Sequence, residues 1–206
     1  MIVLRAKDVE FEVTYINLRD KPDWFLKISP HGKVPVLSVD DQPLFESNAI
    51  AEFLEEQVAP PLHPPDPVKR ARNRAWTDYV PDFSSALSGI YYGKGEDGRA
   101  GRVETARKAL AKLERAIEEE RDNDGPYFNG PELSLVDAAY APFFQRFFFV
   151  EEKLGSGLLD EFPKVKAWAE TLHRDVRVSG SVAESFPQEF VGNLQRREAD
   201  VASLFA

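Results

Sequence analysis

The 206-residue sequence contains no cysteine and only three histidines. The missing thiol excludes disulfides, thiolate metal sites and a cysteine nucleophile within these residues. His31, His63 and His173 are scattered without metal-ligand spacing, so no metal site is predicted. No apolar run is long enough to cross a bilayer, and Met1 leads into Ile-Val-Leu without a secretory cleavage pattern. We therefore expect a cytoplasmic protein with no membrane partner.

Basic residues are fewer than acidic ones, so the formal net charge is −9. That balance argues against a surface made for nucleic acid or for an anionic membrane. Apolar side chains are abundant: 43% of the residues are hydrophobic and 12% are aromatic, which indicates a globular chain with a real core. The length suits one large domain or two small ones.

The first 58 residues alternate short strands with short helices. In "VEFEVTYIN", Val9, Phe11, Val13 and Tyr15 alternate with polar residues, which predicts a strand. "KPDWFLKIS" indicates a short helix or turn that ends at the proline and glycine of "SPHG". The remaining predicted elements are a hairpin formed by residues 34–39 and 43–45, and an amphipathic helix over residues 47–58.

Residues 59–67 contain five prolines in nine positions, which excludes helix and inner strand and predicts a linker between domains. Everything after the linker has helical periodicity. Ser134 and Asp137 have the spacing of a capping box at the start of one of these helices. We therefore expect a small α/β domain over residues 1–58 and an all-α domain over residues 68–206. Helices are predicted over residues 67–80, 101–122, 134–154 and 163–176, and near 187–204.

Two neighbouring features of the first domain could hold a ligand. If Pro35 follows a cis bond at the start of a strand, the backbone of Val34 is left free to pair with an extended, peptide-like ligand. Ser47 and the free amides of the helix start could hold a carboxylate, and Glu46 could hold an ammonium group. For each feature alone, an edge-strand proline or an ordinary N-cap beside a solvated acid is the better interpretation. Lys21 and Lys33 could neutralise a second carboxylate.

Four ordered motifs resemble the soluble glutathione transferase superfamily: "KVPVL", "FESNAI", "DPVKRARNRAW" and "LSLVDAAYAPFFQRF". The stretch "YINLRDKPDWFLKISPHGKVPVL" is similar to the omega class, the branch of thiol transferases and dehydroascorbate reductases. The resemblance runs over nearly the whole chain. It implies a thioredoxin-like N-terminal domain that lacks its first strand here, an all-helical C-terminal domain and a homodimer.

The resemblance also implies roles for individual residues. Val34, before cis Pro35, would bond the cysteinyl backbone of glutathione, and Glu46 and Ser47 would hold its γ-glutamyl head. Lys21 would meet the glycyl carboxylate, and Lys33 lies where the class often has an apolar residue. A hydrophobic or disulfide co-substrate would lie against the helical domain. The residues implied there are Tyr92, Arg146 and Trp168, with Tyr91 and Phe143 as neighbours, although aromatic core packing is the more frequent role of such rings.

The family begins with a strand and a turn that bears the catalytic Cys, Ser or Tyr, and neither has a counterpart here. "MIVLRAKD" resembles the end of the helix that follows that turn. Three explanations are open: a sequence that starts late, which we favour, a gap filled by another segment, or a homologue without the chemistry. The leading hypothesis is a glutathione transferase or thiol transferase of omega-like type whose catalytic residue is unknown. The alternative is a non-catalytic binding or assembly module, and a third hypothesis is a glutathione-dependent isomerase.

Overall fold

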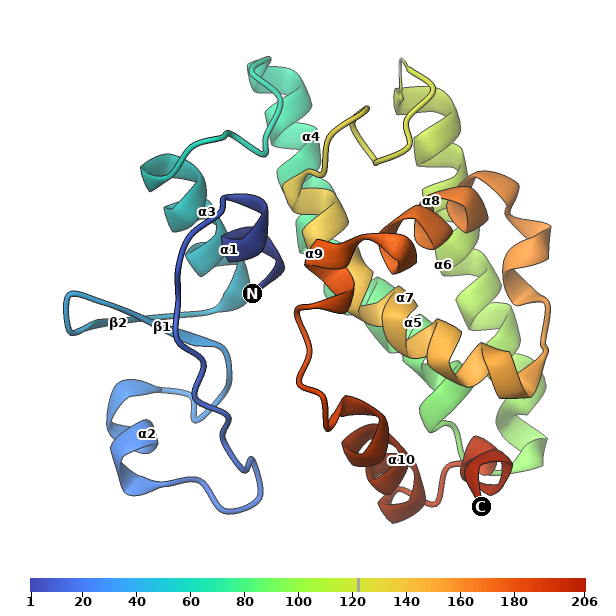
Figure 1. Cartoon of the computed structure of the whole chain (residues 1–206). Coiled ribbons are helices and arrows are strands. Elements are labelled where there is room, and N and C mark those ends of the chain that lie inside the picture. The colour runs from blue at the N-terminus through green and yellow to red at the C-terminus, as the bar shows by residue number, and fades with distance from the viewer. Residues whose placement is uncertain (122) are drawn as a thin grey trace. The chain divides into compact units, whose positions relative to one another are not determined.

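The computed structural model describes residues 1–121 and 123–206, and the chain divides into two compact units (Figure 1). The N-terminal unit comprises Met1 and Val3–His63, and the C-terminal unit comprises Ile2 and Pro64–Ala206. Asp122, which would close the predicted helix over residues 101–122, lies outside the described residues. No helix in the described ranges is long and apolar enough to span a membrane.

The N-terminal unit contains one antiparallel hairpin and three helices. The hairpin pairs Val36 with Phe45 and Val39 with Gln42. Asp40 and Asp41 both have positive φ angles, 48° and 62°, as the favoured two-residue hairpin turn requires. The predicted hairpin and the helix that follows it are therefore confirmed. The elements are α1 (Ile2–Ala6), α2 (Asp23–Ile28), β1 (Val36–Val39), β2 (Gln42–Phe45) and α3 (Ser47–Gln57).

The core of the N-terminal unit lies between α1, α3 and the hairpin. Leu4, Ile50 and Leu54 are buried together, and Leu37 and Leu44 of the hairpin pack against them. Ile50 and Leu54 are four positions apart, so they lie on one face of α3. Residues 47–49 are exposed, so the start of this helix is accessible.

The strand predicted from "VEFEVTYIN" is wrong. Among the described residues the sheet has two strands, β1 and β2, and residues 9–17 pair with neither of them. Val9 and Phe11 do pack against the core, as the alternation indicates, but Val13 and Tyr15 are exposed. A strand needs a neighbour for its backbone hydrogen bonds, and alternation alone does not supply one.

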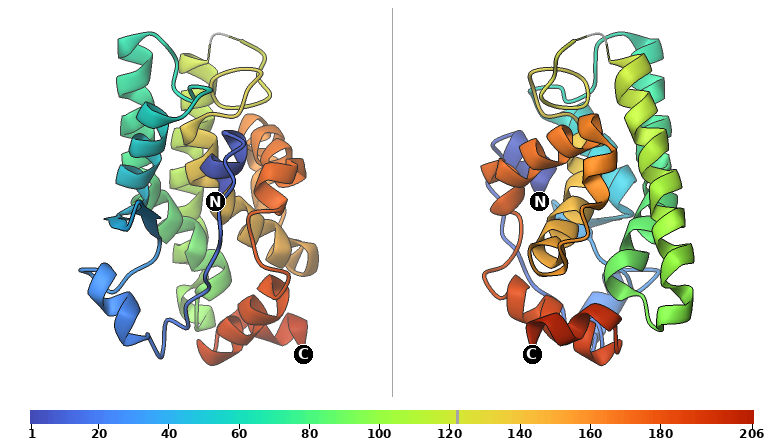
Figure 2. Two further views of the ribbon diagram at one scale, coloured as in Figure 1. Left: turned by 60° about the vertical axis from the view of Figure 1, so that its left-hand side comes forward. Right: turned by 90° about the vertical axis from the view of Figure 1, so that its right-hand side faces the viewer.

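The C-terminal unit is an all-α bundle with α7 at its centre, packed against α4, α5 and α8 (Figure 2). Ser134 and Asp137 form a complete capping box at the start of α7, as predicted. Its helices are α4 (Pro67–Asp78), α5 (Val80–Tyr92), α6 (Arg99–Glu120), α7 (Leu135–Leu154), α8 (Pro163–Arg174), α9 (Val176–Ser179) and α10 (Phe186–Arg196). Short 3₁₀ turns cover Glu96–Gly98, Leu158–Glu161 and Asp200–Phe205.

The last predicted helix, near 187–204, is two elements. Helix α10 ends at Arg196, and a 3₁₀ segment covers Asp200–Phe205. Between them Glu198 has a φ of 53° and Ala199 is extended, and neither conformation continues a helix. Asp200 then bonds back to the N-terminal side of α6, because its carboxylate accepts from Arg102 at 2.8 Å.

Candidate functional site

The loop before β1 leaves the backbone of Val34 outside the sheet. The bond between Val34 and Pro35 is cis, as expected, and the β-ladder begins one residue after the proline, at Val36. Within the described part of the chain, Val34 makes no backbone hydrogen bond, and its side chain is exposed. Both backbone groups of Val34 are therefore available to an external partner.

A buried serine holds this loop. Ser29 caps the end of α2, and its Oγ accepts the N–H of Lys33 at 2.9 Å and donates to the carbonyl of Lys33 at 2.8 Å. The backbone of Lys33 is thereby used inside the unit, while its side chain stays exposed. The loop is positioned by α2 independently of any ligand.

Lys21 lies beside the same loop. Its Nζ is 3.6 Å from the point that a Cβ on Gly32 would occupy, and Gly32 has a φ of 57°. This left-handed conformation favours glycine. The turn at Gly32 places the backbone close to the ammonium group of Lys21. Lys21, Lys33 and Val34 therefore lie within one short segment of the N-terminal unit.

Glu46 and Ser47 begin α3 in a strained geometry. Glu46 is the N-cap residue, with φ 68° and ψ 121°, and Ser47 is the first helical residue. Ser47 is thus not the N-cap that the simplest sequence interpretation assigns to it. A non-glycine residue held at positive φ costs on the order of 1–3 kcal/mol, and such residues cluster at ligand clamps. Both side chains are exposed at the start of an 11-residue helix, where backbone N–H groups point outward along the helix axis.

His31 joins the two features, although nothing in the sequence around it predicts a role at this site. Its Nε2 lies 4.0 Å from Oε1 of Glu46, and its ring packs edge-on against Phe45 at 5.6 Å between centroids. The imidazole and the carboxylate are both more than half exposed, so the pair itself adds little stability. It does show that the loop carrying Lys33 and the start of α3 lie at one edge of the unit.

Two of the implied co-substrate residues converge on α10. Nη1 of Arg146 donates to the carbonyl of Pro142 at 2.7 Å, and its guanidinium lies 5.7 Å from the ring centroid of Phe186. The Tyr92 ring packs edge-on against Phe190, which stacks on Phe186 at 5.5 Å. The stacked rings of Phe186 and Phe190 on α10 therefore contact Arg146 and Tyr92, respectively.

The hydroxyl of Tyr92 accepts a hydrogen bond from Nδ2 of Asn193 at 3.1 Å, and the guanidinium of Arg197 lies 4.4 Å from its ring centroid. Tyr91, the next residue, is 1% exposed, and burial raises the pKa of its phenol far above the usual range. Tyr91 is therefore a neutral core residue. Phe143 packs edge-on against Phe83 of α5 at 6.4 Å.

Trp168 is a core residue and not a wall of a co-substrate pocket. Its side chain is 1% exposed, and its Nε1–H donates to Oδ1 of Asp137 at 2.5 Å. Rings of Phe128, Tyr140 and Phe144 surround the indole at centroid distances of 5.4–5.5 Å. An indole enclosed in this way, with its only donor used, has no face left for a ligand.

Among the residues that the structure describes, no three His, Asp or Glu side chains gather in a group that could hold a metal ion. The accessible groups at the edge of the N-terminal unit are a free backbone pair, a strained helix start, a carboxylate and two ammonium groups. Such a set suits a small extended ligand that carries both signs of charge.

The chain has the architecture of the soluble glutathione transferases, a thioredoxin-like N-terminal domain followed by an all-helical domain. The family profile described as "Glutathione S-transferase, N-terminal domain" matches residues 1–57. The profile "Glutathione S-transferase, C-terminal domain" matches residues 96–171. The chain belongs to the glutathione S-transferase family.

Individual relatives come from two classes of that family. Rat glutathione S-transferase omega-1 is 31% identical over 177 residues, covering 85% of this chain and 71% of that protein. Arabidopsis thaliana glutathione S-transferase U19 is 32% identical over 206 residues, covering 95% and 89%. The solved structure of the tau-class enzyme from mango aligns with a TM-score of 0.81 at 28% identity, covering 94% of this chain and 90% of that one.

Proposed function

We propose that the N-terminal unit binds glutathione and that the protein uses it in a glutathione-dependent transfer of omega-like type. The strained backbone of Glu46 at the start of α3 carries the proposal, because that residue and Ser47 lie at the same edge as the free backbone of Val34. Rice GSTU1, whose structure was solved in complex with glutathione, aligns with a TM-score of 0.77 at 28% identity over 94% of this chain and 87% of that one.

In the proposed complex the ligand lies along the edge of the unit. Val34 pairs through its N–H and C=O with the cysteinyl residue, as an added strand would. The γ-glutamyl ammonium meets Glu46, and the γ-glutamyl carboxylate accepts from Ser47 and the first amides of α3. Lys21 neutralises the glycyl carboxylate, and the exposed Lys33 provides a second positive charge nearby.

For the chemical step we propose thiol transfer. The glutathione thiolate attacks one sulfur of a disulfide co-substrate, a mixed disulfide forms, and the other sulfur leaves as a thiolate. The chain's own contribution in this proposal is to hold the peptide, with no residue of the 206 assigned to activate the thiol. The co-substrate would meet the surface near Tyr92 and Arg146, and we propose a cytoplasmic homodimer as the working form.

Calorimetry with three thiols tests the binding site. Reduced glutathione should bind, cysteinylglycine should bind much more weakly because it lacks the γ-glutamyl head, and γ-glutamylcysteine should lose only the contact with Lys21. The proposal is refuted if calorimetry detects no glutathione binding to the chain and none to a version extended by any residues encoded upstream of Met1. Sedimentation velocity on the same sample tests the homodimer.

A non-catalytic binding or assembly module is the second candidate. The observation that favours it is the lack of cysteine in a chain that resembles a cysteine-dependent class. Assays with a glutathione mixed disulfide and with a chlorodinitrobenzene electrophile separate the two candidates. Turnover above the rate without protein excludes the module, and tight binding of glutathione without turnover of either substrate supports it.

A further inference from the structure

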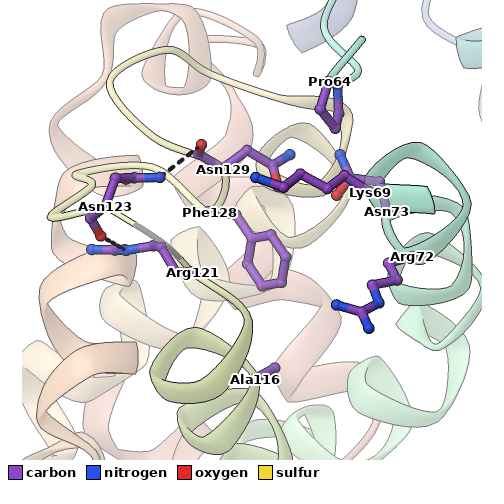
Figure 3. A pocket seen from close by; sticks show the side chains of 9 residues that line it. All are labelled: Pro64, Lys69, Arg72, Asn73, Ala116, Arg121, Asn123, Phe128 and Asn129. Atoms are coloured by element: carbon purple, nitrogen blue, oxygen red, sulfur yellow. Dashed lines mark hydrogen bonds between the residues drawn. The ribbon is translucent and has the colours of Figure 1, made fainter. Parts of the chain in front are cut away.

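The charged groups around the cavity of the C-terminal unit do not converge. This cavity has a volume of about 110 Å³, and its lining includes Arg72, Arg121, Phe128 and Asn129. Figure 3 shows Arg72 across the Phe128 ring from Arg121 and Asn129. A convergent arrangement is found instead at the edge of the N-terminal unit, where the imidazole of His31 faces a carboxylate.

His31 is held at this edge by a turn that three hydrogen bonds close. The N–H of Gly32 donates to the carbonyl of Ser29 at 2.9 Å, and Oγ of Ser29 bonds both backbone groups of Lys33. His31 lies inside that turn, and its ring contacts Phe45 of β2 edge-on. The position of the imidazole is therefore set before any ligand binds, although the side chain is 57% exposed.

The carboxylate that His31 faces belongs to Glu46. The φ of 68° at Glu46 fixes the direction in which its side chain leaves the start of α3. Oε1 lies 4.0 Å from Nε2 of His31, and the carboxylate makes no other hydrogen bond or ion pair with the residues that the structure describes. The imidazole is therefore the protein group that competes with a ligand for this carboxylate.

The other charged groups around this edge are two lysines. Nζ of Lys21 lies beside Gly32, and Lys33 is exposed two residues after His31. Ammonium and carboxylate groups keep their charge near neutral pH, whereas an imidazole changes its charge between about pH 5 and 8. A fall in pH through this range therefore adds one positive charge 4.0 Å from the carboxylate of Glu46.

We propose that His31 is a proton-controlled competitor for Glu46, and that the N-terminal unit binds glutathione best when the imidazole is neutral. This inference rests on the proposed function, in which Glu46 receives the γ-glutamyl ammonium. The imidazolium attracts the same carboxylate and repels the ammonium group that approaches it. By linkage, bound glutathione opposes the protonation of His31 by the same factor.

Calorimetry with reduced glutathione at about pH 5.5 and about pH 7.5, at constant ionic strength, tests the inference. We expect binding to be about threefold weaker in acid, because a solvent-exposed charge pair changes affinity by less than about tenfold. His31→Gln should remove the part of this difference that comes from the imidazole, while any titration of glutathione itself persists. His173→Gln, which removes an exposed imidazole at the end of α8 in the C-terminal unit, is the matched control and should leave the difference unchanged.

Proton NMR of the imidazole rings provides a second measurement, with signals assigned from the same two variants. In the absence of ligand, Glu46→Gln should lower the midpoint of the His31 titration by about half a pH unit, because the imidazolium loses its counter-charge. Saturating glutathione should lower the same midpoint in the unmodified protein, as linkage requires. The midpoint of the His173 titration should stay fixed in both experiments.

Glutathione binding and its pH dependence can fail separately. Absence of binding at both pH values refutes the proposed function, and the role of His31 falls with it. Binding that is equally tight at both pH values, or a difference that His31→Gln retains in full, overturns the role of His31 alone. Tighter binding in acid that depends on His31 also overturns it, because the imidazolium then holds a carboxylate of the ligand. A His31 midpoint that Glu46→Gln does not move shows that the two side chains are uncoupled and excludes the competition.

Discussion

The ammonium group of Lys7 lies 2.9 Å from the carboxylate of Glu55, and the Lys7 side chain is fully buried. Nζ of Lys7 also donates to the carbonyls of Val58 and Pro60, at 2.6 and 2.7 Å. The Glu55 carboxylate accepts from the backbone N–H groups of Leu62 and His63. One buried ion pair thus ties the first part of the proline-rich segment to the N-terminal unit.

Lys7→Met should destabilise this unit by about 3–5 kcal/mol, because it leaves Glu55 without its counter-charge and two carbonyls without their donor. Native-state hydrogen exchange at Leu62 and His63 provides a local measurement, and both amides should lose protection. Glu56→Gln, an exposed neighbour on α3, is the control and should change neither quantity. Full protection in Lys7→Met would show that the ion pair does not anchor the segment.

Much of this fold is predictable from local patterns. The hairpin follows from two apolar runs around Asp40 and Asp41, and α7 follows from the capping box of Ser134 and Asp137. Helix α5, Val80–Tyr92, is absent from the predicted helices, and it has Pro81 in its first turn. Proline is tolerated in the first turn of a helix, where its missing N–H has no partner to lose, so Pro81 ends nothing. The signal was the helical spacing of Phe83, Leu87 and Tyr91.

Removing the groups at the start of α3 should weaken glutathione binding. We expect Ser47→Ala and Glu46→Ala each to cost about 1–3 kcal/mol of binding free energy, through lost charge-assisted hydrogen bonds. Calorimetry measures the change. Ser38→Ala in β1 and Glu56→Ala in α3 are the matched controls, since both residues are exposed and lie in the same unit. Affinity that is unchanged in both Ser47→Ala and Glu46→Ala would exclude the helix start as the binding site.

Asp137 should be the most sensitive polar residue of the C-terminal unit. Its carboxylate is fully buried and accepts from the backbone N–H groups of Phe128 and Ser134, the Ser134 hydroxyl and the Trp168 indole. Burial raises the pKa of Asp137, and these hydrogen bonds oppose the rise. Asp137→Ala leaves several buried donors unpaired, so we expect a loss of about 4 kcal/mol or more.

Ser134→Ala is the graded comparison, because it removes the cap but keeps the carboxylate. It should cost about 0.5–2 kcal/mol, the usual value of an N-cap. Urea unfolding followed by tryptophan fluorescence measures both variants. Equal losses for Asp137→Ala and Ser134→Ala would show that Asp137 matters only as part of the cap and not as the acceptor for Trp168.

The candidate site was less predictable than the fold. Residues near one another in sequence, such as Glu46 and Ser47, are predicted to share a site directly from the motif that contains them. The approach of His31 to Glu46 depends on how the loop folds back over β2, and 15 positions of sequence separate them. Trp168 carried a misleading signal, because an aromatic residue of a helical domain has the same appearance in sequence whether it lines a pocket or fills a core. Its buried acceptor, Asp137, lies on another helix.

Acid should weaken the C-terminal unit through Asp175. Burial alone would raise the pKa of Asp175, but hydrogen bonds from Arg177 and Tyr127 outweigh it and hold the pKa below the usual value. The hydroxyl of Tyr127 donates to Oδ2 at 2.9 Å, and Nη2 of Arg177 donates at 2.7 Å. Because the native pKa is depressed, the unfolded chain binds more protons in acid, where an unfolded aspartate has a pKa of about 3.9.

The stabilisation from Asp175 is therefore complete well above that value and is lost as pH falls through the native pKa. We expect Asp175→Asn to reduce the free energy of unfolding at pH 7 by about 1–3 kcal/mol, and the difference from the unmodified protein to shrink towards pH 3. Urea midpoints across this range measure it, with exposed Asp97→Asn as the control. A difference that stays constant with pH would mean that the ionised carboxylate contributes no more than its neutral form, and that the contacts of Tyr127 and Arg177 act through packing alone.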